Sequence, residues 1–204
     1  SGDPSQTSTL NVNEEISRSG WEAHGSSPYL DADDGDTNRI RSTSLNGEAV
    51  YKFQALPSDA SLIEGLSLSV VWRPDGTYWT WIQAETHVYI AVEGKFEYFI
   101  GNFGGRAPPW DNPWRTYTFN LDHLIDIISV DDLKNRKIKV KFVNKSDNLS
   151  TNITHAYLSV IYTKSGNQQT GEQVTIAFSK EKITGIYIES RMDSDSYPRN
   201  YRIY

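Results

Sequence analysis

The chain has 204 residues, of which 20 are Lys or Arg and 26 are Asp or Glu, so its formal net charge at pH 7 is −6. It has no basic stripe, which argues against nucleic acid or an anionic membrane as partner, and no apolar run long enough for a membrane span. The absence of cysteine excludes a disulfide framework, and 6 Trp with 12 Tyr favour strands over helices.

The N-terminal stretch is polar and would fray unless something ties it down. Its one alternating pattern comprises Thr9, Leu10, Asn11 and Val12. We expect these residues to add as a strand to an open sheet edge of another copy of the chain. Residues 1–13 would then be a tail or donor strand, and residues 14–204 a single domain. Packing of the tail on its own domain is the alternative, and it would favour sugar binding over assembly.

An acidic segment follows, in which carboxylates and an amide stand close together. Its possible metal ligands are Asp31, Asp33, Asp34, Asp36 and Asn38. Ca²⁺ prefers six to eight oxygen ligands of this kind. We therefore expect the segment to bind Ca²⁺, which would hold it against the rest of the domain. The spacing differs from a helix-loop-helix calcium loop, because Gly35 is fifth and Ser42 is twelfth. The alternative is a surface turn whose side chains bond their own backbone.

Strands are expected where apolar and polar residues alternate between turn signals. The ranges are 48–53, 63–72, 79–83, 86–92, 95–101, 116–120, 138–142, 156–162, 174–178, 183–188 and 201–204. A Gly- and Pro-rich loop is expected over 102–113, and one helical turn over 122–128, capped by Asn120 or Asp122. This pattern predicts an all-β protein, an antiparallel two-sheet β-sandwich of jelly-roll type with one short helix.

Two aromatic groups are candidates for sugar binding. The first comprises Tyr78, Trp79 and Trp81 in an expected strand, and the second comprises Trp110, Asp111 and Trp114 in a proline-stiffened loop. Flat rings on a rigid support can stack on sugar faces while neighbouring polar groups bind hydroxyls. The alternative is that these rings cover the open end of the sandwich.

The sequence lacks the usual catalytic signatures, including the nucleophile elbow, the phosphate-cradling glycine loop and the zinc-protease motif. Its four His residues are scattered, which is unlike a zinc site. The segment 96–104 faintly resembles the nucleophile strand of small jelly-roll xylanases, with Glu189 downstream as acid/base. However, an outward position on an alternating strand explains Glu97 better, because the other motifs of that family are missing. We expect no enzyme.

Three acceptor sequons for N-glycosylation lie in one polar turn region, headed by Asn144, Asn148 and Asn152. Their clustering predicts an exported surface that carries glycans. A polar loop rich in Asn, Ser and Thr is the alternative.

The runs 19–21 and 25–40, followed by the strand over 48–53, resemble the start of jelly-roll modules in archaeal and phage extracellular surface proteins. They are also broadly similar to carbohydrate-binding modules. The resemblance implies a β-sandwich at the cell surface, but such sandwiches host sugar binding, adhesion and assembly alike. We therefore predict a non-enzymatic secreted structural protein that forms a filament or layer by strand addition and is stabilised by Ca²⁺. The alternative is a carbohydrate-binding module of a secreted glycoside hydrolase or adhesin.

Overall fold

The computed structural model describes residues 4–75, 83–106, 112–165, 186–190 and 199–203. The chain divides into one unit of residues 5–164 and another of residues 1–4 and 165–204. The second unit holds an antiparallel pair, β11 (Ile186–Ser190) with β12 (Arg199–Ile203). These boundaries differ from the predicted ones, since the larger unit begins at residue 5 rather than 14 and ends at residue 164 rather than 204.

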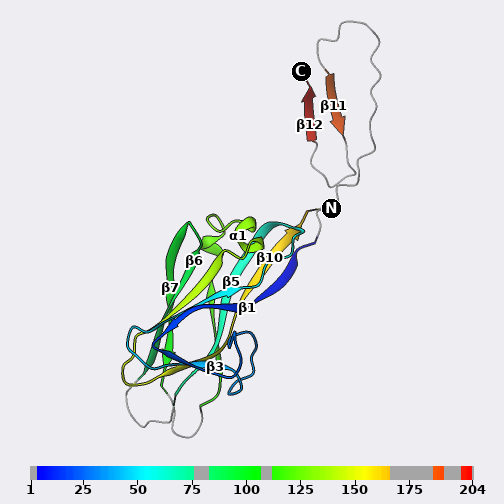
Figure 1. The fold of residues 1–204 in the computed structure, drawn as a ribbon. Coiled ribbons are helices and arrows are strands. Elements are labelled where there is room, and N and C mark those ends of the chain that lie inside the picture. The colour runs from blue at the N-terminus through cyan, green and yellow to red at the C-terminus, as the bar shows by residue number, and fades with distance from the viewer. Residues whose placement is uncertain (1–3, 76–82, 107–111, 166–185, 191–198, 204) are drawn as a thin grey trace. The chain divides into compact units, whose positions relative to one another are not determined.

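The larger unit is built from two antiparallel sheets (Figure 1). Sheet A contains β2 (Trp21–His24), β3 (Arg39–Ser42), β5 (Ala60–Pro74), β8 (Arg115–Asn120) and β10 (Thr151–Lys164). Sheet B contains β4 (Glu48–Phe53), β6 (Ala84–Val92), β7 (Phe96–Gly105) and β9 (Ile138–Asn144). In sheet B the strand order is β4-β9-β6-β7, so β7 is an edge strand.

Strand β1 (Gln6–Ser19) joins the two sheets. Residues 6–11 pair with β10 of sheet A, and residues 12–19 pair with β4 of sheet B, with register shifts between Val12 and Glu14 and between Glu15 and Ser17. In Figure 1 this strand runs in blue beside the yellow β10. Bulges let β1 bend into the second sheet without ending, so the strand is continuous up to Ser19.

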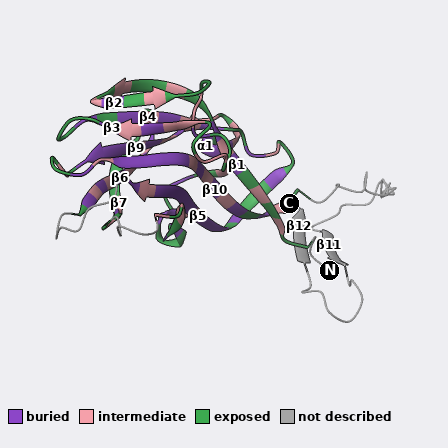
Figure 2. Cartoon of the chain, turned by 90° about the horizontal axis from the view of Figure 1, so that it is seen from below, coloured by how far each residue is buried: buried purple, intermediate pink, exposed green. Residues whose placement is uncertain are grey.

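The core lies between the sheets and follows the two-residue period of the strands. Along β6 buried and partly exposed residues alternate without a break, and Val88 and Ile90 are fully buried. They belong to the same core cluster as the fully buried Leu68 and Val70 of β5. Figure 2 shows the same alternation as purple segments interleaved with pink and green along the strands. Strand β6 therefore leaves every second side chain on an outer face of sheet B.

The helical prediction over 122–128 is only partly right. A 3₁₀ helix, η1 (Asp122–Leu124), begins there, and the Asn120 side chain accepts a hydrogen bond from the Asp122 amide at 2.8 Å. The α-helix lies further on as α1 (Val130–Lys134), where Ser129 and Asp132 form a capping box. The carboxylate three residues after Ser129 decides where the α-helix starts, and this signal outweighs the apolar pattern before it.

The predicted fold class is confirmed: the described residues are mostly antiparallel β-sheet arranged as a β-sandwich, and they include one short α-helix. The expected strands over 48–53, 86–92, 116–120 and 138–142 agree with β4, β6, β8 and β9 to within two residues at each end. The predicted loop over 102–113 starts too early, because β7 continues to Gly105. The predicted strand over 174–178, all but the last residue of 79–83, and the first part of 183–188 lie outside the described residues. No helix among the described residues has the length and apolar character needed to cross a membrane.

Candidate functional site

The outer face of sheet B, which points away from sheet A, carries a row of aromatic and polar side chains. The alternation of β6 brings Glu85, His87, Tyr89 and Ala91 to this face. On β9, Lys139 and Lys141 lie on it because Ile138, Val140 and Phe142 fill the core. In the strand register Tyr89 lies opposite Lys141 on one side and opposite Phe99 of β7 on the other. One cross-strand row therefore contains a cation and two aromatic rings.

A β-bulge in β7 determines which residues of that strand reach the outer face. Val88 pairs with Gly101 and Tyr89 with Phe99, which leaves Ile100 as the extra residue. Because side chains alternate along a strand, an added residue moves everything beyond it to the other face. Phe103 is buried in the core on one side of the bulge, whereas Phe99 on the other side is 47% exposed. Without the bulge, Phe99 would point into the core.

Gly101 makes this bulge possible. Its φ of +138° lies where only glycine is comfortable, and a Cβ placed there would lie 3.0 Å from Cε1 of Phe119. The backbone thus approaches a core ring more closely than a side chain would permit. The position of Phe99 on the outer face depends on this glycine.

The aromatic rings on the face form a compact group. Phe99 lies 5.3 Å from Tyr89 and 5.2 Å from His87, measured between ring centroids, with interplanar angles of 57° and 50°. The Nζ atom of Lys141 lies 4.6 Å from the centroid of the Tyr89 ring, which is a cation–π distance. Phe99 is therefore held from the side by two rings while about half of it faces solvent.

Polar groups flank the rings on both sides. Glu85 accepts hydrogen bonds from Asn102 at 3.3 Å and lies 2.9 Å from Nε2 of His87. On the other side Lys141 donates to Glu97 at 2.5 Å. An exposed ring between hydrogen-bonding groups suits a ligand that has both apolar ring faces and hydroxyls. Glu97, considered above as a nucleophile, is paired with a lysine on an open face, and the side chain of Glu189 lies outside the described residues.

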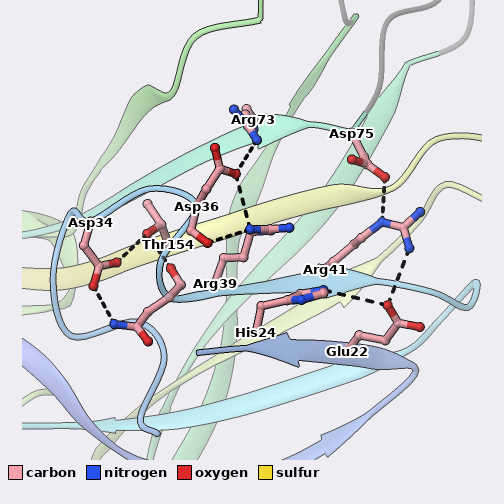
Figure 3. Close-up of polar contacts among 10 residues, drawn as sticks. Glu22, His24, Asp34, Asp36, Arg39, Arg41, Arg73, Asp75 and Thr154 are labelled. Atoms are coloured by element: carbon pink, nitrogen blue, oxygen red, sulfur yellow. Dashed lines mark hydrogen bonds and ion pairs between the residues drawn. The ribbon is translucent and has the colours of Figure 1, made fainter. Parts of the chain in front are cut away.

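The acidic segment folds beside sheet A, where its carboxylates contact protein groups (Figure 3). Asp34 accepts from Asn38 at 2.5 Å and from the Thr154 hydroxyl at 3.2 Å. Asp31 forms an isolated bridge with His155. Burial lowers the pKa of His155, although the charges of Asp33, Asp31 and Asp34 act in the opposite direction. Backbone and side chains of β10 therefore hold this loop.

The next carboxylate, Asp36, lies between two arginines. Its Oδ1 is 2.5 Å from Nη2 of Arg73 and 3.3 Å from Nη1 of Arg39. Nearby, Arg41 pairs with Asp75 at 2.6 Å and with Glu22 at 3.5 Å, as Figure 3 shows. Among the residues that the structure describes, no group of three or more His, Asp or Glu side chains is arranged to hold a metal ion. Ca²⁺ binding by Asp31, Asp33, Asp34, Asp36 and Asn38 stays a prediction.

The aromatic groups predicted for sugar binding fall mostly outside the described residues, namely Tyr78, Trp79, Trp81, Trp110 and Asp111. Trp114 is described, and its ring lies 4.6 Å from the guanidinium carbon of Arg73. A Cβ on Gly35 would lie 3.1 Å from Nε1 of Trp114. Trp114 thus packs against the acidic loop and Arg73 of sheet A, and it is not part of the outer face of sheet B.

The three sequon asparagines are not on one loop. Asn144 ends β9, is 2% exposed, and donates to the carbonyls of Ser44 and Ser146. Asn152 lies within β10 and is 1% exposed. Only Asn148 lies exposed between the strands. A glycan attached to either buried side chain would have to displace packed protein atoms, so Asn148 alone offers an accessible acceptor.

The predicted assembly strand is engaged within its own unit. Thr9, Leu10 and Asn11 pair with Ser159, Leu158 and Tyr157 of β10. Leu10 and Val12 are buried in the core, at 2% and 0% exposure. The expectation that Thr9, Leu10, Asn11 and Val12 complete a sheet of another copy is therefore wrong, since these residues already complete their own.

Tyr89, Phe99 and His87 were not predicted as site residues. The alternation over 86–92 places His87 and Tyr89 on the same face of the strand, so their proximity could have been predicted from the sequence. Phe99 was not readable in this way, because without the bulge at Gly101 it would lie on the same side as Phe103.

No known protein family matches the sequence, and no curated protein matches it either. The solved structures that resemble the chain include three carbohydrate-binding modules. A family 29 module from Piromyces equi is 13% identical, with 78% of this chain and 91% of that chain covered and a TM-score of 0.34. TmCBM61 in complex with β-1,4-galactotriose is 12% identical, covering 76% and 87% with a TM-score of 0.33. A CBM4 structure is 13% identical, covering 69% and 94% with a TM-score of 0.36.

These neighbours agree with the carbohydrate-binding-module part of the resemblance, whereas the archaeal or phage part has no support in the comparisons. Their TM-scores lie below 0.5, so they carry no argument about the site or function of this chain.

Proposed function

We propose that the unit of residues 5–164 binds polysaccharide through the outer face of sheet B. The observation that carries this proposal is the exposure of Phe99, which a bulge brings out of the core onto an ordered sheet face. Burying a Phe side chain contributes about 1.5–3 kcal/mol, and the bulge forgoes that gain. A phenyl ring held at the surface in this way is available to a ligand.

The surroundings of Phe99 fit a sugar better than an apolar partner. Tyr89 and His87 support the ring from the side, and donors and acceptors in the same and nearby cross-strand rows come from Glu85, Asn102, Glu97 and Lys141. Sugar rings have an apolar face for stacking and hydroxyls for such groups. We infer a binding role, without catalysis, for a protein that acts outside the cell where polysaccharides occur.

This function replaces the filament as the leading interpretation. Assembly by strand addition depended on a free N-terminal strand, and β1 is instead paired with β10 and β4 of its own unit. The supporting feature for self-association is thereby lost. A sugar-binding module was the alternative derived from the sequence, and the site now proposed differs from the one expected there.

Affinity electrophoresis in gels that contain soluble polysaccharides tests this function. The purified chain should be retarded by at least one of a panel of glucans, mannans, galactans and xylans. Phe99→Ala should strongly weaken the retardation, while Tyr98→Ala should retain it, because Tyr98 is exposed to 46% on the other side of the same strand. Equal retardation of both variants, or no retardation of the wild type by any polymer, would overturn the proposal.

A further inference from the structure

Three lysines line the outer face of sheet B beside the aromatic rings. Lys52 projects from β4, and Lys139 and Lys141 project from β9, with Lys52 paired directly opposite Lys139. Their side chains are only 20%, 25% and 17% exposed, since their stems lie along the sheet. On its own, such a row would attract anionic polymers.

Two glutamates cover this row. Glu93, in the turn between β6 and β7, lies 3.3 Å from Nζ of Lys52 and 3.8 Å from Nζ of Lys139. Glu97 accepts from Lys141 at 2.5 Å. The hydrogen bond from Lys52, followed by the charges of Lys52 and Lys139, lowers the pKa of Glu93. Both carboxylates therefore form ion pairs with the lysines beneath them and offset the positive charge of the row.

The order of these groups from the sheet outward matters for a ligand. The glutamate side chains are 53% and 47% exposed, whereas those of the lysines are 17–25% exposed. An approaching polymer meets carboxylates first. Glu93 and Glu97 together pair with all three lysines of the row.

We infer that Glu93 and Glu97 determine ligand class, restricting the face to uncharged polysaccharide and excluding carboxylated polymers. This inference rests on the proposed function and names its substrate class. A carboxylated chain would need to displace Glu93 and Glu97 from their lysines and would be repelled by them as it approached. A neutral chain needs only to exchange hydrogen bonds with the same groups.

The ion pairs are too exposed to serve mainly as structural supports, because exposed pairs contribute little to folding stability. Glu93→Gln and Glu97→Gln should therefore leave the thermal transition almost unchanged. This separates a role in selectivity from a role in folding. Asp126→Asn serves as a matched control, since it removes one negative charge in the exposed segment between η1 and α1.

The test uses two polymers with one backbone, hydroxyethylcellulose and carboxymethylcellulose, in affinity gels at low ionic strength. The wild type and Asp126→Asn should not be retarded by carboxymethylcellulose. Glu97→Gln should be retarded, and Glu93→Gln/Glu97→Gln more strongly, with an apparent affinity at least about tenfold above wild type. High salt should abolish the gain, and adding Phe99→Ala to the double variant should reduce it.

Retardation of the wild type by carboxymethylcellulose, or no gain in the double variant, would overturn the inference. The proposed function is decided separately, by whether any polymer in the wider panel retards the wild type through Phe99. A double variant that gains retardation independently of Phe99 would also count against the inference, because the gain would then be nonspecific attraction.

Discussion

The rings of Tyr89 and Phe99 meet across the β6–β7 pair, with centroids 5.3 Å apart and planes tilted by 57°. Tilted pairs at this distance contribute about 0.5–1.5 kcal/mol beyond their burial. The pair exists only because the bulge turns Phe99 outward. The backbone conformation of the edge strand β7 therefore shapes the surface that we propose as the binding site.

A double-mutant cycle measures this relationship. Tyr89→Ala and Phe99→Ala should each weaken polysaccharide binding, and the double variant should be less affected than the sum, by about 0.5–1.5 kcal/mol. Titration calorimetry with the bound polymer gives the four affinities. Strictly additive losses would show that Tyr89 does not support Phe99.

Replacing the glycine of the bulge should affect stability and binding together. Gly101→Ala places a Cβ 3.0 Å from Phe119 at a φ of +138°, and we expect a loss of about 1–3 kcal/mol in the free energy of unfolding, with weaker binding. Gly94→Ala is the control, since Gly94 has a φ of +75° but nothing within 4 Å of its Cβ. Urea unfolding compares the two. An equal effect of both substitutions would remove the special role of the bulge.

Stability at acid pH should depend on Asp132, whose side chain is 3% exposed and accepts from Lys95 at 2.6 Å. Burial alone would raise the pKa of Asp132, but the hydrogen bonds from Lys95 and Ser129 outweigh it and lower that pKa below 3.8. The stabilisation is therefore complete above the unfolded pKa and is lost as pH falls through the lower folded pKa.

Asp132→Asn should cost about 1–3 kcal/mol at pH 7, and the gap to wild type should shrink below pH 3.8. Urea midpoints from pH 7 to pH 2 provide the measurement, with Asp131→Asn as the exposed neighbour for control. A gap that stays constant down to pH 2 would contradict the assignment.

Ca²⁺ binding by the acidic loop remains a proposal from the sequence. A ligand at a hundred times its dissociation constant would stabilise the fold by about 2.7 kcal/mol. The melting temperature should therefore rise in millimolar Ca²⁺ relative to chelator, and Asp34→Asn should diminish the rise. The same melting temperature in both buffers would contradict Ca²⁺ binding. The loop would then be held only by the contacts of Asp34 with Asn38 and Thr154 and by the arginines around Asp36.

Glycosylation in a secretory host should be confined to Asn148. Glycopeptide mapping should find that site occupied and should find Asn144 and Asn152 bare, since these two are 2% and 1% exposed. Asn148→Gln should then remove all N-linked glycan. Occupancy at either buried asparagine would mean that its strand position is wrong.

Much of the fold could be read from the sequence because strand periodicity is a local property. The alternation in residues 48–53 and 138–142 predicts their inward and outward faces directly. The continuity of β1 through Glu14 and Ser17 was not readable, because it depends on bulges that only pairing with β4 reveals. The capping box at Ser129 marks the start of α1 and was readable from the sequence. The sequence analysis instead placed the helical turn in the preceding apolar run.

The candidate site was less predictable than the fold. The sequence draws attention to tryptophan, yet the described Trp114 packs beside Arg73. Phe99 becomes a site residue only through a register shift between β6 and β7, which is a property of two strands together. The ion pairs that neutralise the lysines likewise join residues from three strands and a turn. No single stretch of sequence therefore predicts them.

Amide chemical-shift mapping tests the central claim most directly. Short oligosaccharides of the polymer that retards the chain most strongly would be titrated into isotope-labelled protein. We predict that the perturbed amides gather on β6, β7 and β9, around Tyr89, Phe99 and Lys141. Perturbations that gather instead on sheet A, around Ser159 or Trp114, would contradict the account.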